Sequence, residues 1–201
     1  MKNKILRVAL LVLAIVIIVV LAVLGVTRLI DKKPEASVKS FVEALKAGDF
    51  ETAKKYTSDE TWTALEIADN SEDEDLEMMK LYFKCLDIKV VQVTKSRNQA
   101  IVKAEITNKD LKTILGNYIQ EALKLALQNI SSKEDQETME NQLKEYFKSQ
   151  FESEEITNVT NTVDIVLNKV DGQWKVVVDE SLRDALLPGL SEVSNMYSFA
   201  A

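Results

Sequence analysis

Cysteine and histidine, two of the most common catalytic residues, are scarce in this chain of 201 residues, which has one cysteine and no histidine. Cys85 lies in an apolar segment, at helical spacing from Met78 and Tyr82. A nucleophilic cysteine or serine needs a base to take its proton, and histidine is the usual one. The absence of histidine therefore excludes Ser-His-Asp triads, Cys-His dyads and most zinc sites. We expect Cys85 to be a small buried hydrophobic residue, and we predict no catalytic residue and no metal site.

The other concentration of reactive groups is acidic, with six carboxylates between Asp69 and Glu77. They lack the Asp-x-Asp-x-Asp-Gly spacing and the closing glutamate of a calcium loop. Carboxylates also gather at the start of a helix, where they meet the positive end of its dipole, and an apolar helix is predicted over Leu76–Leu86. The alternatives are a loose cation site and a solvated loop with a helix cap. We expect the second, and we expect no cofactor.

The strongest signal in the sequence is a membrane anchor. The nineteen residues from Val8 to Val26 carry no charged or polar side chain. At about 1.5 Å per residue, a helix of this length spans roughly 28 Å, which matches the ~30 Å hydrocarbon core of a bilayer. A surface helix of a globular protein would offer a polar stripe to water, and this one has none. We predict a transmembrane helix, ending at Val8 and Val26, that contacts membrane lipid.

This anchor is expected to stay uncleaved. A cleaved secretory signal has an apolar stretch of about 7–15 residues and an Ala-x-Ala-like site, whereas this longer stretch leads into Val26–Ile30 without one. A lipoprotein would need a cysteine directly after the stretch, and Cys85 is far downstream. Basic residues are nearly balanced across the span, but the short leader leaves no room for a domain. We expect a single-pass protein of the cell membrane with its carboxyl-terminal domain outside the cytoplasm; a cleaved signal is the alternative.

From Pro34 to Ala201 the chain is acidic, with 19 basic and 31 acidic side chains and a net charge of −12. Such a surface repels phosphate backbones, so we exclude nucleic acid as a partner. It equally disfavours anionic lipid headgroups and anionic wall polymers, and it suits a basic partner or bound cations better. Negative charge is also a common means of staying soluble, which is the simpler interpretation.

The segment after the anchor is long enough for one domain with its own core. We place this domain over residues 34–187, followed by a loose tail over residues 188–201. Apolar residues at three- and four-residue steps predict a first helix over Glu35–Ala47, with Pro34 in its first turn and Gly48 as its carboxyl-terminal cap.

Two further helix starts carry capping signals. Asp49 is predicted to cap a helix over Phe50–Tyr56. Thr57 and Glu60 form a capping box for the next helix, which carries Trp62.

Two β-hairpins are predicted from alternating apolar residues. The first joins Ile88–Lys95 to Ala100–Thr107 through a turn at Ser96–Gln99. The second covers Val163–Val178 and turns at Asp171–Gly172, a dipeptide typical of two-residue hairpin loops.

A pair of long helices over about 110–153 separates the two hairpins. The first helix ends near Asn129, and Ser131 with Glu134 opens the second. A role at the membrane surface would need a basic polar face, and the second helix is acidic. We therefore expect the pair to pack onto the domain. A last short helix is predicted over Ser181–Leu187.

Helices first, then hairpins, describe an α+β domain with a curved antiparallel sheet. The segments Pro34–Tyr56 and Val170–Val178 resemble the nuclear transport factor 2-like (cystatin-like) superfamily, and more narrowly its uncharacterised membrane-anchored extracytoplasmic domains in Gram-positive bacteria. The resemblance covers about 30 positions at the two ends of the domain. It implies a cone whose helices close over the concave face of the sheet, and the pair over about 110–153 is then an insertion in that fold.

The resemblance also implies an apolar pocket, for which Tyr56, Trp62, Tyr82 and Trp174 are candidate lining residues. Isomerases of this fold use a carboxylate base and a hydroxyl donor in a dry pocket. Tyr56, Tyr82 and Asp87 are residues of these types, but their spacing marks no site. Large aromatic residues are also common in cores, and that alternative stays open.

These observations favour a membrane-anchored binding or interaction module without catalysis, whose partner is an envelope protein or a small ligand. One alternative is a small-pocket enzyme for proton transfer or hydrolysis, which an apolar cavity with a convergent carboxylate would support. The other is a structural assembly factor in a membrane complex, which a filled core and an exposed apolar patch would support. The oligomeric state does not follow from the sequence.

Overall fold

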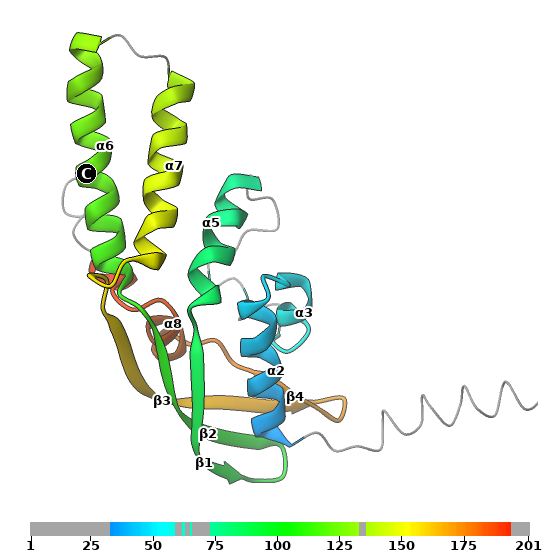
Figure 1. Ribbon diagram of the computed structural model, residues 1–201. Coiled ribbons are helices and arrows are strands. Elements are labelled where there is room, and N and C mark those ends of the chain that lie inside the picture. The colour runs from blue at the N-terminus through cyan, green and yellow to red at the C-terminus, as the bar shows by residue number, and fades with distance from the viewer. Residues whose placement is uncertain (1–32, 59–61, 63–64, 66–72, 133–135, 194–201) are drawn as a thin grey trace, which may run out of the picture.

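The computed structural model describes residues 33–58, 62, 65, 73–132 and 136–193 (Figure 1). The predicted transmembrane helix from Val8 to Val26 lies outside these residues. No helix in the described part of the chain is both long and apolar enough to cross a membrane. The described residues form an α+β domain with an open four-stranded antiparallel sheet in the order β1-β2-β3-β4, which confirms the predicted fold class at that level.

Helices, a hairpin, a helical pair, a second hairpin and a last helix follow one another as the sequence predicts. In chain order the described elements are α2 (Pro34–Lys46), α3 (Phe50–Lys54), α5 (Asp73–Lys84), β1 (Asp87–Lys95), β2 (Gln99–Lys109), α6 (Leu111–Ser132), α7 (Gln136–Glu152), β3 (Asn158–Val170), β4 (Gln173–Val176) and α8 (Glu180–Leu186).

Local capping signals set the ends of the first helices. Pro34 occupies the first turn of α2, where its missing N–H costs nothing. Gly48 follows the helix at a φ of +68°, a backbone conformation that favours glycine. The Asp49 carboxylate accepts a hydrogen bond from the Thr52 N–H at 2.9 Å and caps α3. These features confirm the predicted start of α3 and the end of α2 to within one residue, whereas α3 ends at Lys54, two residues before the predicted end.

Of the capping box predicted at Thr57 and Glu60, the structure describes only Thr57, because Glu60 lies outside the described residues. The Thr57 hydroxyl donates to the Lys54 carbonyl at 3.1 Å, so it closes the turn before it. Its backbone forms a parallel bridge with Val176, which ties this segment to β4.

Both hairpins form with the predicted turns. The Ser96 N–H donates to the Gln99 carbonyl at 2.8 Å across the first turn. In the second turn Asp171 and Gly172 have φ values of +49° and +78°, as a two-residue hairpin of the mirror-image type requires. A bulge between Val90 and Gln92 shifts the register of β1, and bulges of this kind bend a strand.

One face of the sheet builds the core and the other meets water. Along β2 the side chains of Ala100, Val102, Ala104 and Ile106 are buried, which confirms the predicted alternation. Helices pack over this face, and their largest fully buried side chains include Phe41, Phe83, Leu45, Leu182 and Leu186. The opposite face carries ion pairs such as Lys89–Glu105 at 2.9 Å and Lys103–Asp164 at 3.8 Å. A sheet covered on one side is usual for antiparallel strands.

The helical pair α6 and α7 leaves the sheet as a hairpin (Figure 1). Its base belongs to the core, where the rings of Tyr118 and Phe147 lie 5.9 Å apart and Ile114 is fully buried. Further along α6, Leu123 and Leu127 are 61% and 69% exposed. The expectation that the pair packs onto the domain therefore holds only at its base, because the distal helices have no sheet beneath them.

The start of the expected loose tail is in fact held against the domain. The Leu111 N–H donates to the Pro188 carbonyl at 3.0 Å, Leu190 packs against the core, and Lys112 pairs with Glu192. Residues 194–201 lie outside the described part of the chain. Residues 188–193 therefore lie over the first turn of α6, and the loose tail over residues 188–201 stays a prediction.

Candidate functional site

The four aromatic residues proposed as pocket lining lie in or against the hydrophobic core. Trp62, Tyr82 and Trp174 are 3%, 4% and 1% exposed, and Tyr56 is partly buried against the same cluster. Among the described residues, the indole nitrogens of Trp62 and Trp174 have no hydrogen-bond partner. None of the four lines the groove described below, so their role in binding a ligand stays a prediction.

Tyr82 and Asp87, two residues of the types found in isomerase sites, differ in their exposure: Tyr82 is buried and Asp87 is exposed. The buried Tyr82 hydroxyl donates to the Lys109 carbonyl at 3.0 Å. Burial raises the pKa of this hydroxyl, and nearby Asp110 and Cys85 raise it further, so it stays protonated as a structural donor. Asp87 is exposed at the start of β1.

Cys85 is a half-buried residue at the end of α5. Its thiol lies 3.9 Å from the Leu81 carbonyl oxygen, within reach of a weak hydrogen bond. Burial raises the pKa of the thiol, and this effect outweighs the opposite influence of Lys109 and Lys84. The thiol therefore stays protonated at neutral pH, as a structural cysteine does.

The reactivity of Cys85 gives a direct test of this assignment. Because the thiolate is the nucleophile and its pKa is raised, we expect the folded chain to react with iodoacetamide more slowly at neutral pH than the chain unfolded in urea. The rate in the folded chain should also begin to rise at a higher pH than the rate in the unfolded chain. Mass spectrometry of the single-cysteine peptide measures both. A folded chain that reacts as fast as the unfolded one at neutral pH would contradict the assignment.

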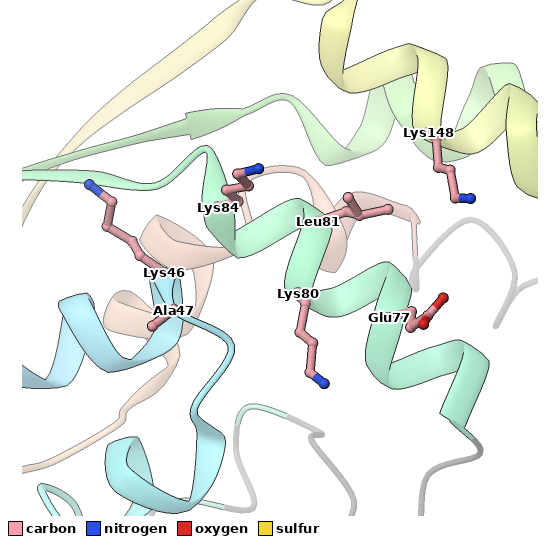
Figure 2. A pocket seen from close by; sticks show the side chains of 7 residues that line it. All are labelled: Lys46, Ala47, Glu77, Lys80, Leu81, Lys84 and Lys148. Carbon is pink, nitrogen blue, oxygen red and sulfur yellow. The ribbon is translucent and has the colours of Figure 1, made fainter.

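An open groove of about 500 Å³ lies between the end of α2, one face of α5 and the side of α7 (Figure 2). We call it the lysine groove, and its lining residues are Lys46, Ala47, Glu77, Lys80, Leu81, Lys84 and Lys148. Four of these seven are lysines and one is acidic. Ala47 and Leu81 add apolar surface between the charged side chains.

A close approach of two elements positions the middle of the groove. The turn after α2 reaches α5 at Gly48, where an added Cβ would lie 2.5 Å from the Cγ of Lys80. The stem of Lys80 therefore packs directly on the glycine. Lys84 follows four residues later on α5 and stands one helical turn away. The turn at Gly48 thus brings the end of α2 beside two lysines of α5.

The charges of the groove are unbalanced. Lys46, Lys80 and Lys84 make no side-chain hydrogen bond or ion pair with any residue that the structure describes. The acidic lining residue, Glu77, already lies 3.5 Å from the Lys144 amine. Lys148 pairs with Glu145 at 2.9 Å. Three amines are therefore available to an anionic ligand, although the net charge of the chain, −7, by itself suits a basic partner better.

The predicted acidic segment lies mostly outside the described residues. Asp69 and Glu72 belong to the part that is not described. Helix α5 runs over Asp73–Lys84 and so begins three residues before the predicted start at Leu76, which places acidic residues in its first turn. Within the described ranges, no group of three histidine, cysteine, aspartate or glutamate residues is arranged to hold a metal ion.

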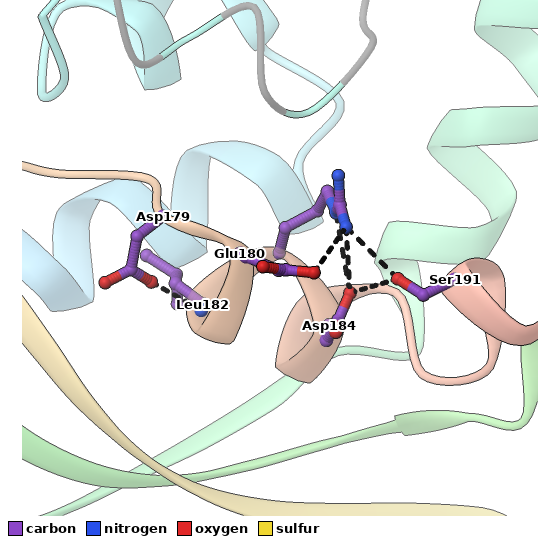
Figure 3. A network of polar contacts seen from close by, with 6 residues as sticks. Asp179, Glu180, Leu182, Asp184 and Ser191 are labelled. Carbon is purple, nitrogen blue, oxygen red and sulfur yellow. Dashed lines mark hydrogen bonds and ion pairs between the residues drawn. The ribbon is translucent and has the colours of Figure 1, made fainter.

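A polar network joins α8 to the segment that follows it (Figure 3). The Ser191 hydroxyl donates to the Asp184 carboxylate at 2.6 Å, and an Arg183 Nη lies 3.1 Å from the same hydroxyl. The guanidinium also lies 3.3 Å from Asp184. The network is best explained as a tie that holds residues 188–193 in place.

Comparison with known proteins gives little further information. No protein family matches the chain, and no curated protein is similar to it. Among solved structures, the chain is similar to a "putative lipoprotein" (YcdA) from Bacillus subtilis, with 19% sequence identity and a TM-score of 0.40. The match covers 74% of this chain and 44% of the other, so this chain spans less than half the length of that protein.

Proposed function

We propose that this chain is a membrane-anchored, extracytoplasmic binding module that takes an acidic segment of an envelope protein into the lysine groove and performs no catalysis. One observation carries the proposal. The amines of Lys46, Lys80 and Lys84 have no acidic partner among the described residues, and they surround an open groove on a chain of net charge −7. Opposite charge steers an encounter and fixes its register more than it adds affinity.

The arrangement of the amines favours an extended ligand over a small anion. In Figure 2 the side chains of Lys46, Lys80 and Lys84 point in different directions and do not converge on one point. A single phosphate or carboxylate would meet only one of them. A peptide with spaced carboxylates can reach several, while Ala47 and Leu81 offer contact to its apolar groups.

The sequence is the basis for two parts of the proposal, the membrane anchor and the cone fold. The uncharged span over Val8–Val26 supports the anchor. The helices that pack on one face of a bent antiparallel sheet support the resemblance to nuclear transport factor 2-like domains (Figure 1). The large aromatic residues Phe41, Phe83 and Trp174 fill the interior between these layers, which supports a module that binds at its surface.

A charge reversal in the groove tests the proposed binding. The probe is a fluorescein-labelled peptide of alternating glutamate and alanine, and the control peptide has glutamine in place of glutamate. We expect the double variant Lys80→Glu/Lys84→Glu to bind the acidic peptide about tenfold more weakly, because each exposed ion pair contributes about 0.2–1 kcal/mol and reversal adds repulsion. Fluorescence anisotropy with the full chain in nanodiscs measures the affinity.

A matched variant controls for total charge. Lys39→Glu/Lys124→Glu makes the same charge change at exposed positions of α2 and α6 that lie outside the groove. We expect it to bind the acidic peptide nearly as tightly as the unchanged chain. The proposal fails if the two double variants lose affinity equally, or if the glutamine peptide binds as well as the acidic one.

A second candidate, a structural assembly factor in a membrane complex, is supported by a separate observation. Leu123 and Leu127 lie one helical turn apart on α6 and are 61% and 69% exposed. Exposed apolar side chains that lie together often mark a contact with another protein. Loss of a crosslinked complex in cells that carry Leu123→Gln/Leu127→Gln, with the groove peptide still bound, would favour this function over the first.

A further inference from the structure

Basic residues gather at the end of the domain where α2 begins. Lys33 precedes that helix, Lys95 ends β1, Arg97 lies in the β1–β2 turn, and Lys169 lies near the end of β3. We call these four residues the basic end. Figure 1 shows the start of α2 at the same end of the sheet as the two hairpin turns. Among the described residues, the acidic ones within two positions of these four in the sequence are Glu35 and Asp171, so the formal charge of this end is positive.

Two contacts hold the basic end together. The Lys169 N–H donates to the Asn98 carbonyl at 2.8 Å, which ties β3 to the β1–β2 turn. The amines of Lys95 and Lys169 lie 5.3 and 5.4 Å from the ring centroid of Trp174. Trp174 itself is only 1% exposed, so it is a fixed support beneath the two lysines. The arrangement therefore depends on the core.

The predicted anchor joins the domain at this end. Six residues, 27–32, separate the end of the predicted span from Lys33. Fully extended, they reach at most about 20 Å. Electrostatic attraction to a charged surface acts over a Debye length of about 8 Å at physiological ionic strength. The tether is therefore short enough to let the basic end come within a Debye length of the membrane surface, where it senses the charge of the lipid.

Negative charge lies toward the opposite end of the molecule. Glu137 and Glu140 are exposed near the start of α7, in the hairpin that points away from the start of α2 in Figure 1. The lysine groove includes Lys46, at the far end of α2 and about 20 Å along that helix from Lys33. A uniform net charge of −12 would disfavour any anionic surface, but an uneven distribution selects an orientation.

We propose that the basic end contacts the anionic phospholipid headgroups of the membrane that holds the anchor. This inference rests on the membrane anchor of the proposed function. The contact orients the domain so that the α6–α7 hairpin stands away from the lipid and the lysine groove stays accessible to a partner. Each basic residue near an anionic bilayer strengthens the contact about fivefold.

The test measures which end of the domain lies near lipid. The full chain, with Cys85→Ala, is reconstituted in nanodiscs of phosphatidylglycerol mixed with phosphatidylcholine, and in nanodiscs of phosphatidylcholine alone. A fluorophore is attached through Asn98→Cys at the basic end or through Glu137→Cys on α7, and headgroup-nitroxide lipids quench it. We expect stronger quenching at residue 98 than at residue 137 in the anionic discs, and a smaller difference in the neutral discs or in high salt.

Two double variants separate this contact from groove binding. Lys33→Glu/Arg97→Glu should remove the preferential quenching at residue 98 and leave binding of the acidic peptide intact. Lys80→Glu/Lys84→Glu should do the reverse. Equal quenching at the two positions, or quenching at residue 98 that is the same in anionic and neutral discs, would overturn the lipid contact while the anchor stands. A chain that separates from the discs on gel filtration would overturn the anchor, and this inference with it.

Discussion

Replacing Trp174 by alanine is expected to lower the free energy of unfolding by about 3–5 kcal/mol, the range seen for large buried aromatic residues. Trp174 is 1% exposed on β4. Its ring fills the space between the sheet and the helices, and the amines of Lys95 and Lys169 lie above it. Truncation would leave a cavity and remove the support of both lysines. Urea denaturation followed by circular dichroism measures the change.

Val170 offers the matched control, because it lies on the neighbouring strand and is 47% exposed. Val170→Ala should change the free energy of unfolding by no more than about 0.5 kcal/mol. The comparison also bears on the predicted pocket. A tryptophan that lines an open pocket makes fewer contacts with the protein, so a cost for Trp174→Ala below about 1 kcal/mol would contradict its place in the core.

Replacing Gly189 by alanine is expected to be among the most damaging single-methyl changes in the chain. Gly189 has a φ of +90°, where an L side chain costs about 1–2 kcal/mol. An added Cβ would also lie 2.6 Å from the Cβ of Lys112 and 2.9 Å from its backbone nitrogen. Neither atom can swing away, because both belong to the first turn of α6. Overpacking of this kind adds about 1–3 kcal/mol.

The variant Gly172→Ala distinguishes the cost of the backbone conformation from the cost of the steric clash. The φ of Gly172 is +78°, but nothing lies within 4 Å of an added Cβ, so Gly172→Ala carries only the backbone cost. We expect both variants to unfold at lower urea concentration, with Gly189→Ala clearly the less stable. We also expect Gly189→Ala to increase amide hydrogen exchange at the start of α6, where the segment around residue 189 is held. Equal losses for the two glycines would show that the contact with Lys112 carries no energetic cost.

Features that depend only on residues close together in the sequence could be predicted. The alternation of buried side chains in β2, the cap at Asp49 and the turn at Asp171–Gly172 all form as expected. Each depends on backbone conformation and on neighbours within about four residues. The order of helices and hairpins then follows, and with it the α+β class.

The lysine groove was not predicted, although part of its signal is present in the sequence. Lys80 and Lys84 stand four residues apart, as do Lys144 and Lys148, and such pairs share a helix face. The negative net charge of the chain gives no indication of this local basic site. Only the packing of α2, α5 and α7 brings Lys46, Lys80 and Lys148 to one groove, because contacts between distant elements depend on how their faces fit together.

The burial of large apolar side chains also depended on the tertiary structure. The resemblance to nuclear transport factor 2-like domains made Trp174, Tyr82 and Trp62 candidates for a pocket lining. Large aromatic residues equally suit a core, and the sequence did not choose between the two. Tertiary packing decided that all three are almost fully buried. The helical hairpin shows the converse, since α6 has the apolar spacing of a packed helix and yet exposes Leu123 and Leu127. Local sequence sets which faces can be buried, whereas the three-dimensional arrangement of the elements determines which of them meet a partner.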